Sequence, residues 1–152
     1  MPRLSRMIAS LFYVGFIPGM PGTYASIITA LVLFGVYSLT DRIHPVIHFG
    51  VLCIITLIGI LVSAEIGRNT GVEDPPYIVI DEVAGQLLTF LFLPLTGWNI
   101  LLGILAFRIF DIWKPFPIRK LEQLGNGVGV MADDLLAGIY GNIVLQIVNI
   151  LL

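Results

Sequence analysis

The sequence predicts an all-α protein, a polytopic membrane bundle of about five membrane helices with a short N-terminal helix at the membrane surface. Hydrophobic residues make up 57% of the 152 residues and charged residues only 12%, against roughly 45–50% and about 25% in soluble domains. The mean hydropathy is +0.98. The few charged residues are separated by long uncharged stretches, several of them close to the roughly 20 residues that a membrane-crossing helix needs. The length fits a single domain, residues 1–152.

Three uncharged stretches each predict one membrane helix: Tyr24–Thr40, Val46–Ala64 and Leu135–Leu152. A fourth stretch, Val83–Phe107, is longer and contains Pro94 and Gly97. Because proline and glycine break helices and form turns, this stretch can be one kinked helix or a hairpin that turns at residues 93–97. We adopt the hairpin because of where the basic residues then lie.

With the hairpin, seven of the eight basic residues share one face of the membrane and only Arg42 lies opposite. By the positive-inside rule this face is cytoplasmic, with the N-terminus inside and the C-terminus outside. Arg3 and Arg6 begin the predicted surface helix, residues 3–15. The proline-rich loop at residues 15–22 is unlike a signal-peptide cleavage site.

Charge and cysteine content exclude several classes of protein. A net charge of −2 offers no basic surface for nucleic acid, so no nucleic-acid partner is expected. Cys53 is the only cysteine, which excludes a disulfide within the chain and a cysteine-based metal cluster. The hydrophobic content excludes a disordered chain.

Two adjacent pairs of acids, Asp81 with Glu82 and Asp133 with Asp134, open predicted helices on the cytoplasmic face. Acids in such apolar surroundings are costly to bury unless cations or a metal ion accompany them. A simpler reading is that acids stabilise helix N-termini, although an N-cap explains only one of two adjacent aspartates. Small residues, among them Gly85 and a stripe through Gly138 and Gly141, permit close packing beside the acids.

Arg108, Asp111 and Lys114 recur every three residues at the end of the second hairpin arm, which Pro115 should terminate. The cations can complement a helix C-terminus or bind phosphate, whereas an acid there is unfavourable without a partner. Arg119 and Lys120 lie beyond that proline and are expected to anchor the helix end at lipid headgroups.

Other polar residues are less specific. Thr23 and Ser26 can cap the first membrane helix, or can present hydroxyl groups to a phosphate. His44 and His48 have the spacing of a metal pair, but they lie at the opposite face and are expected to be structural or interfacial.

Five acids and two cations would therefore meet at one membrane face. Carboxylates without cysteine or histidine favour a hard cation such as Mg²⁺, and arginine and lysine bind phosphate. The combination predicts phosphoryl transfer on a lipid headgroup.

The chain resembles the phosphatidylglycerophosphatase A family over most of its length, from about residue 12 to 142. Four blocks carry the resemblance: Pro21–Thr23 with Ser26, Ile80–Gly85, Arg108–Ile118 and Gly127–Gly138. The first block departs most, with Pro-Gly-Met-Pro-Gly-Thr at residues 18–23 where the family often has a Trp-Ala-Pro-Gly-Thr-like run. The resemblance implies an all-helical, Mg²⁺-dependent enzyme of the bacterial cytoplasmic membrane. It would remove the terminal phosphate of phosphatidylglycerophosphate and release phosphatidylglycerol.

From the charge pattern and the resemblance we expect three overlapping sets of site residues. The expected catalytic residues are Asp81, Glu82, Asp111, Lys114, Asp133 and Asp134. The expected substrate-binding residues are Thr23, Ser26, Arg108 and Lys114. The expected Mg²⁺ ligands are Asp81, Glu82, Asp133 and Asp134. The nucleophile is expected to be a metal-activated water, with an aspartate as the alternative.

Two other functions have to be weighed. A small cation-binding transporter or channel subunit would also be apolar, but its acids should lie near the bilayer midplane. A lipid phosphotransferase of the CDP-alcohol type would share the lipid, the acids and the metal, but its spaced aspartate signature is absent from the sequence.

Overall fold

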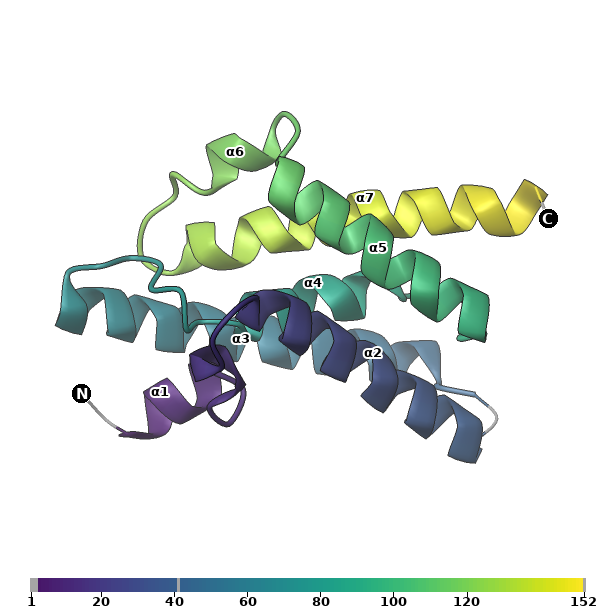
Figure 1. The fold of residues 1–152 in the computed structure, drawn as a ribbon, viewed down its shortest axis with the longest axis horizontal. Coiled ribbons are helices and arrows are strands. Elements are labelled where there is room, and N and C mark those ends of the chain that lie inside the picture. The colour runs from purple at the N-terminus through teal and green to yellow at the C-terminus, as the bar shows by residue number, and fades with distance from the viewer. Residues whose placement is uncertain (1–2, 41, 152) are drawn as a thin grey trace.

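The computed structural model describes residues 3–40 and 42–151, and all regular structure in these residues is helical (Figure 1). This confirms the predicted fold class. A short 3-10 turn, η1 (Val14–Phe16), accompanies seven α-helices. The helices are α1 (Arg3–Ala9), α2 (Pro21–Thr40), α3 (Pro45–Thr70), α4 (Ile80–Thr89), α5 (Gly97–Trp113), α6 (Ile118–Leu121) and α7 (Val128–Leu151).

Three helices, α2, α3 and α7, are long and apolar enough to cross a membrane. They coincide with the three uncharged stretches that predict single spans, although Leu152, the predicted end of the last span, lies outside the described residues. The structure extends α3 beyond Ala64 to Thr70, and α7 begins at Val128 rather than at Leu135.

The fourth uncharged stretch forms a hairpin of two shorter helices. Arg108, near the end of α5, has its Nη1 3.8 Å from the Glu82 Oε1 in the first turn of α4, so the chain turns back between them. The 10 residues of α4 and 17 of α5 give lengths of about 15 and 26 Å at 1.5 Å per residue. Neither reaches the roughly 20 residues of a full span, so the predicted count of about five spans is not established.

The short helix α4 occupies the centre of the bundle, where it packs against α2, α3, α5 and α7. Eight of its residues are buried. The surrounding helices instead expose large apolar side chains, among them Leu31 on α2, Leu61 on α3 and Ile147 on α7. Apolar side chains on the outside of a bundle are suited to lipid hydrocarbon. Enclosure by its neighbours explains how a helix too short to cross can lie within the bundle.

The N-terminal segment is a shorter helix than predicted. The expected helix over residues 3–15 is wrong in extent, because α1 ends at Ala9 and three consecutive left-handed residues, 11–13, redirect the chain into η1. The Ser5 hydroxyl donates a hydrogen bond to Glu65 on α3, and the Phe16 ring stacks on Tyr77 at 4.8 Å between centroids. The segment is therefore packed against α3 and the α3–α4 loop.

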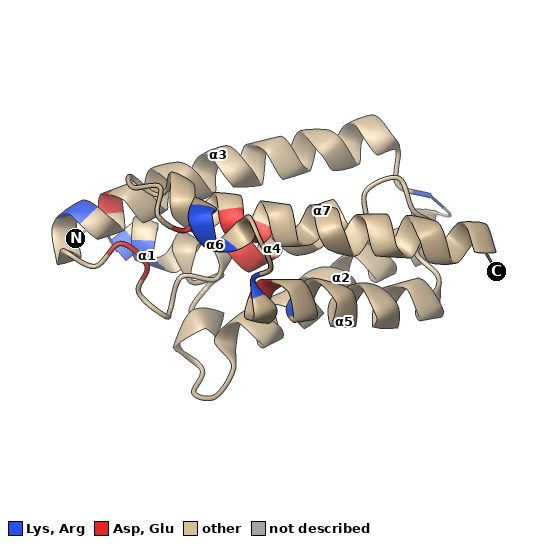
Figure 2. Cartoon of the chain, turned by 90° about the horizontal axis from the view of Figure 1, so that it is seen from above, with Lys and Arg blue, Asp and Glu red and all other residues tan. Residues whose placement is uncertain are grey.

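Charged residues gather toward one end of the bundle (Figure 2). The segments at that end include α1, α6 and the starts of α4 and α7, whereas the α2–α3 connection that contains Arg42 lies at the other end. Gly71 and Asn126, which follow α3 and precede α7, line one cavity. The hairpin therefore returns the chain to the end from which it started, as the distribution of basic residues predicts.

Candidate active site

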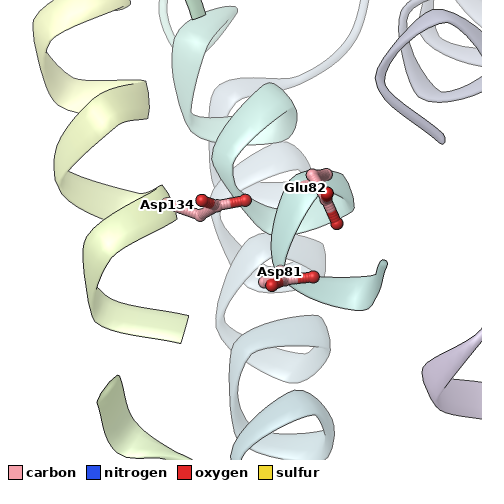
Figure 3. Close-up of side chains that lie close together, drawn as sticks. All are labelled: Asp81, Glu82 and Asp134. Carbon is pink, nitrogen blue, oxygen red and sulfur yellow. The ribbon is translucent and has the colours of Figure 1, made fainter. Parts of the chain in front are cut away.

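Three acidic side chains from two helices meet at the charged end of the bundle. Asp81 and Glu82 lie in the first turn of α4, and Asp134 projects toward them from α7 (Figure 3). A carboxylate oxygen of each lies within 4.8 Å of one from each of the others. These three residues are called the carboxylate group below; Asp134 follows Glu82 by 52 residues in the chain.

Two glycines allow α4 and α7 to approach closely enough for this arrangement. A Cβ atom on Gly138 of α7 would collide with the carbonyl oxygen of Gly85, and one on Gly85 would collide with the Asp134 carbonyl and the Phe107 ring. The two backbones are therefore in direct contact one helical turn beyond the acids, as the stripe of small residues predicts.

We expect Gly138→Ala to destabilise the protein, because the added methyl must push α4 and α7 apart. Overpacking of this kind costs about 1–3 kcal/mol, and the effect is measured as a lower midpoint of thermal unfolding in detergent. Gly35→Ala on α2 is the matched control, since no atom lies within 4 Å of its added Cβ. Equal midpoints for the two variants would contradict the close contact between the helices.

The carboxylate group is largely buried, with Glu82 half-buried, and it lacks some of the hydrogen-bond partners that buried acids need. Asp81 is 7% exposed and Asp134 is 3% exposed. One oxygen of each of the three carboxylates has no hydrogen-bond partner among the described residues. Buried carboxylates need positive charge and hydrogen-bond donors, and a donor set made only of carboxylate oxygens suits a hard cation. These three residues could therefore hold a metal ion such as Mg²⁺.

Each of the two cations is held by an acid. Arg108 Nη1 is 2.6 Å from Asp111 Oδ2 and 3.8 Å from Glu82. Lys114 Nζ is 2.7 Å from Asp133 Oδ2 and 3.0 Å from Glu122 Oε1. Burial alone would lower the pKa of Lys114, but the hydrogen bonds and charges of Asp133 and Glu122 outweigh it and raise the pKa above its ordinary value. Lys114 therefore remains a protonated, fixed charge.

Two acids that the sequence groups with the others, Asp111 and Asp133, have cations as their partners in the structure. Asp133 points to Lys114 and lies outside the carboxylate group, and Asp111 is paired with Arg108. Both acids of α7 lie well inside a helix that starts at Val128. They therefore do not open that helix, and an N-cap role is excluded for them. Asp81 and Glu82 do lie in a first helical turn, where the helix dipole stabilises acids.

The beginning of α2 packs directly against the site. A Cβ atom on Gly22 would collide with the Glu82 carboxylate and approach the Arg108 guanidinium. The Oγ1 atom of Thr23 is buried without a hydrogen-bond partner among the described residues. Ser26 is completely buried, and its hydroxyl donates to the Gly22 carbonyl. Of the two hydroxyl groups, only that of Thr23 is left available to a ligand.

Three further polar residues belong to the surroundings of the site but are not among the predicted site residues. Glu122 binds Lys114. Gln86 is completely buried, and neither its amide nitrogen nor its amide oxygen has a partner among the described residues. Partial burial and the charges of Asp81 and Asp133 raise the pKa of Asp74 to about 7, although much of the residue remains exposed. Of these three residues, only Gln86 could have been inferred from the sequence, because it follows Glu82 by one helical turn and therefore lies on the same helical face.

The two histidines are structural, as expected. His44 caps α3, with its Nδ1 accepting a hydrogen bond from the Val46 backbone N–H. His48 is buried, and its Nε2 lies 3.0 Å from the Leu87 carbonyl oxygen.

Comparison with known proteins identifies the family. A sequence model of phosphatidylglycerophosphatase A matches residues 7–149. The chain belongs to the phosphatidylglycerophosphatase A family. Two relatives carry that name: one from Haemophilus influenzae is 37% identical over 140 residues, which cover 91% of this chain and 84% of the relative. The other, from Escherichia coli, is 31% identical over 135 residues, covering 88% and 76%.

A further relative in Bacteroides thetaiotaomicron, provisionally named a phosphatidylinositol-3-phosphatase, is 33% identical over 145 residues, which cover 93% of this chain and 91% of the relative. No solved structure matches the chain. Membership of the family confirms the resemblance and makes the protein a phosphatase. The four blocks that carry the resemblance meet at the charged end: they begin α2, α4 and α7 and end α5.

Proposed function

We propose that the protein hydrolyses the terminal phosphomonoester of phosphatidylglycerophosphate in an Mg²⁺-dependent reaction, giving phosphatidylglycerol and phosphate. One observation carries the proposal: two buried carboxylates and one half-buried carboxylate from α4 and α7 meet near two acid-held cations, Arg108 and Lys114. Oxygen ligands for a divalent metal, together with fixed cations, are what phosphoryl transfer requires of a protein. The names of the relatives from Haemophilus influenzae and Escherichia coli support this substrate.

The residues of the carboxylate group fit Mg²⁺, because their donors are all oxygen atoms and one oxygen of each is buried without a partner. When bound there, the metal would polarise the phosphate and lower the pKa of a water molecule, the proposed nucleophile, with an aspartate as the alternative. Asp133 holds the Lys114 ammonium in place, and Asp111 holds the Arg108 guanidinium. These cations bind the phosphate oxygens and stabilise their charge as the P–O bond breaks.

The identity of the lipid is tested by comparing substrates. The purified protein is assayed for phosphate release from phosphatidylglycerophosphate, phosphatidylinositol 3-phosphate and phosphatidic acid, each at the same mole fraction in neutral detergent micelles. We expect the highest kcat/KM for phosphatidylglycerophosphate. A higher kcat/KM for phosphatidylinositol 3-phosphate would instead favour the activity for which the Bacteroides thetaiotaomicron relative is named. Failure to hydrolyse any of the three would overturn the proposed function.

A transporter or channel function is the weaker alternative. It would require acids near the middle of the bilayer, whereas the carboxylate group lies in the first turn of α4 and the second turn of α7, at the charged end of the bundle. Membership of a phosphatase family also favours hydrolysis.

The proposed location is the bacterial cytoplasmic membrane, with the site on the cytoplasmic face, because seven of the eight basic residues lie on that side of the hairpin. Cysteines at Thr70 and Asn126 should then be protected from an impermeant thiol reagent added outside intact cells. A cysteine at Leu39, at the other end of α2, should be labelled. All three are made in a Cys53→Ser background, since Cys53 is exposed. Labelling of Thr70→Cys or Asn126→Cys from outside would contradict this orientation.

A further inference from the structure

A cavity of about 520 Å³ has Lys114, one of the two cations of the site, among its lining residues. It is formed by the α5–α6 connection and by α6 itself. Its walls include two aromatic rings and three cations: Trp113, Phe116, Lys114, Arg119 and Lys120. The site described above uses only Lys114 from this set.

The cavity carries positive charge that the protein does not neutralise. Lys114 is paired with Asp133 and Glu122. Within residues 3–40 and 42–151, neither Arg119 nor Lys120 lies within 4.0 Å of a carboxylate. The Lys120 ammonium lies 5.0 Å from the centre of the Phe116 ring, which holds it at the wall of the cavity. Two cations without an acidic partner favour an anion as the ligand.

The surroundings of the cavity place that anion at the level of lipid headgroups. The Trp113 side chain is 69% exposed and Phe116 is 76% exposed, and tryptophan is typical of the interface between headgroups and hydrocarbon. Lys114 connects the cavity with the site, because its ammonium lies 2.7 Å from Asp133, the residue before Asp134. An anion in the cavity would therefore lie against the same cation, Lys114, that borders the site through Asp133.

The proposed substrate has a second phosphate close to the first. Its terminal phosphomonoester is joined through one glycerol to a phosphodiester, which carries the diacylglycerol. We infer that Arg119 and Lys120 bind this phosphodiester in the cavity while the phosphomonoester lies at the carboxylate group. The inference rests on the proposed function, since it assigns the second phosphate of the same lipid.

Such a subsite would bind the phosphodiester, a group that several lipids share. Phosphatidylglycerophosphate and phosphatidylinositol 3-phosphate both contain the phosphodiester, whereas phosphatidic acid has only a phosphomonoester. Arg119 and Lys120 would therefore favour lipids in which a polyol separates two phosphates. Simple attraction of the two cations to an anionic membrane would not make this distinction.

Binding is measured without turnover by using the reaction product. Short-chain phosphatidylglycerol, which keeps the phosphodiester and lacks the phosphomonoester, is titrated into the protein in neutral detergent micelles. Trp113 fluorescence reports binding after Trp98→Phe, since these are the two tryptophans of the chain. We expect Arg119→Gln with Lys120→Gln to raise the Kd at least about tenfold. The charge-matched control, Arg3→Gln with Arg68→Gln, should keep the parent Kd. An unchanged Kd in the first variant, or an equal rise in both, would overturn the inference.

Kinetics provide the second arm of the test. The Arg119→Gln, Lys120→Gln variant should raise KM for phosphatidylglycerophosphate about tenfold with little change in kcat, because the lost contact is made equally before and during the reaction. Inhibition by inorganic phosphate, which reports the phosphomonoester site, should be unchanged. A loss confined to kcat would overturn the inference. Failure of the parent protein to hydrolyse the lipid would instead overturn the proposed function, and the fluorescence titration would still decide on the cavity.

Discussion

Asp134→Asn is expected to lower phosphate release by at least about a hundredfold at saturating Mg²⁺, since it removes the charge of one of the three carboxylates that we propose as metal ligands. Asp133→Asn should lower it comparably, but for a different reason. Asp133 lies outside the carboxylate group and holds the Lys114 ammonium at 2.7 Å. The Mg²⁺ concentration for half-maximal activity should therefore rise for Asp134→Asn and change little for Asp133→Asn.

Both variants should remain folded, because asparagine has nearly the same size as aspartate and removes a buried charge. The midpoint of thermal unfolding in detergent provides the control for folding. Near-normal turnover of both variants at saturating Mg²⁺ would show that the carboxylate group does not carry the reaction. An equal rise in the Mg²⁺ requirement of both would contradict the separate placement of the two acids.

The second large effect concerns the cations. Arg108→Gln and Lys114→Gln should each lower kcat roughly a hundred- to thousandfold, corresponding to about 2.7–4 kcal/mol, if the loss of a charge-stabilising donor in another enzyme is a fair guide. Both side chains lie beside the acids of the site. Arg119→Gln and Lys120→Gln should change kcat little, because these cations line the neighbouring cavity and do not reach the carboxylate group.

Each of the four variants is assayed over a range of lipid concentrations in mixed micelles, so that kcat and KM are obtained separately. Lys114→Gln leaves the buried Asp133 without its cation, which can itself destabilise the fold. The double variant Lys114→Gln, Asp133→Asn removes that unpaired charge and should recover the unfolding midpoint without recovering kcat. Equal and small losses of kcat in all four single variants would leave no phosphate-binding cation identified.

The membrane helices could be predicted from the sequence because their signal is local. An uncharged stretch of the right length specifies α2, α3 and α7, and the distribution of basic residues favours the hairpin. The ends of the helices depend on tertiary contacts that periodicity does not reveal. For example, α4 ends at Thr89, where the Asn142 side chain on α7 donates hydrogen bonds to the carbonyl groups of Thr89 and Leu91. The predicted start of α7 at Leu135 is wrong because an uncharged stretch ends at an acid, whereas Asp133 and Asp134 are buried and lie inside a helix that begins at Val128.

The residues that form the site could be predicted from the sequence, but which acid binds which cation could not. Adjacent acids in an apolar frame indicate a cation site, and the spacing of Arg108 and Asp111 places both on one helical face. The partners of Lys114 could not be inferred, because Pro115 and Pro117 interrupt the helical spacing before Glu122. Asp133 likewise faces Lys114 only because α5 and α7 pack side by side. Adjacent aspartates therefore take different partners, which the sequence alone does not distinguish.

We propose that this chain hydrolyses a lipid phosphate with a metal ion held by Asp81, Glu82 and Asp134. The most direct measurement is phosphate release from phosphatidylglycerophosphate by purified protein that has been stripped with EDTA and then titrated with Mg²⁺. We expect no release above background in EDTA and a saturable recovery with Mg²⁺, which should be absent from an Asp134→Asn preparation purified in parallel. Full activity in EDTA, or equal activity in the two preparations, would contradict it.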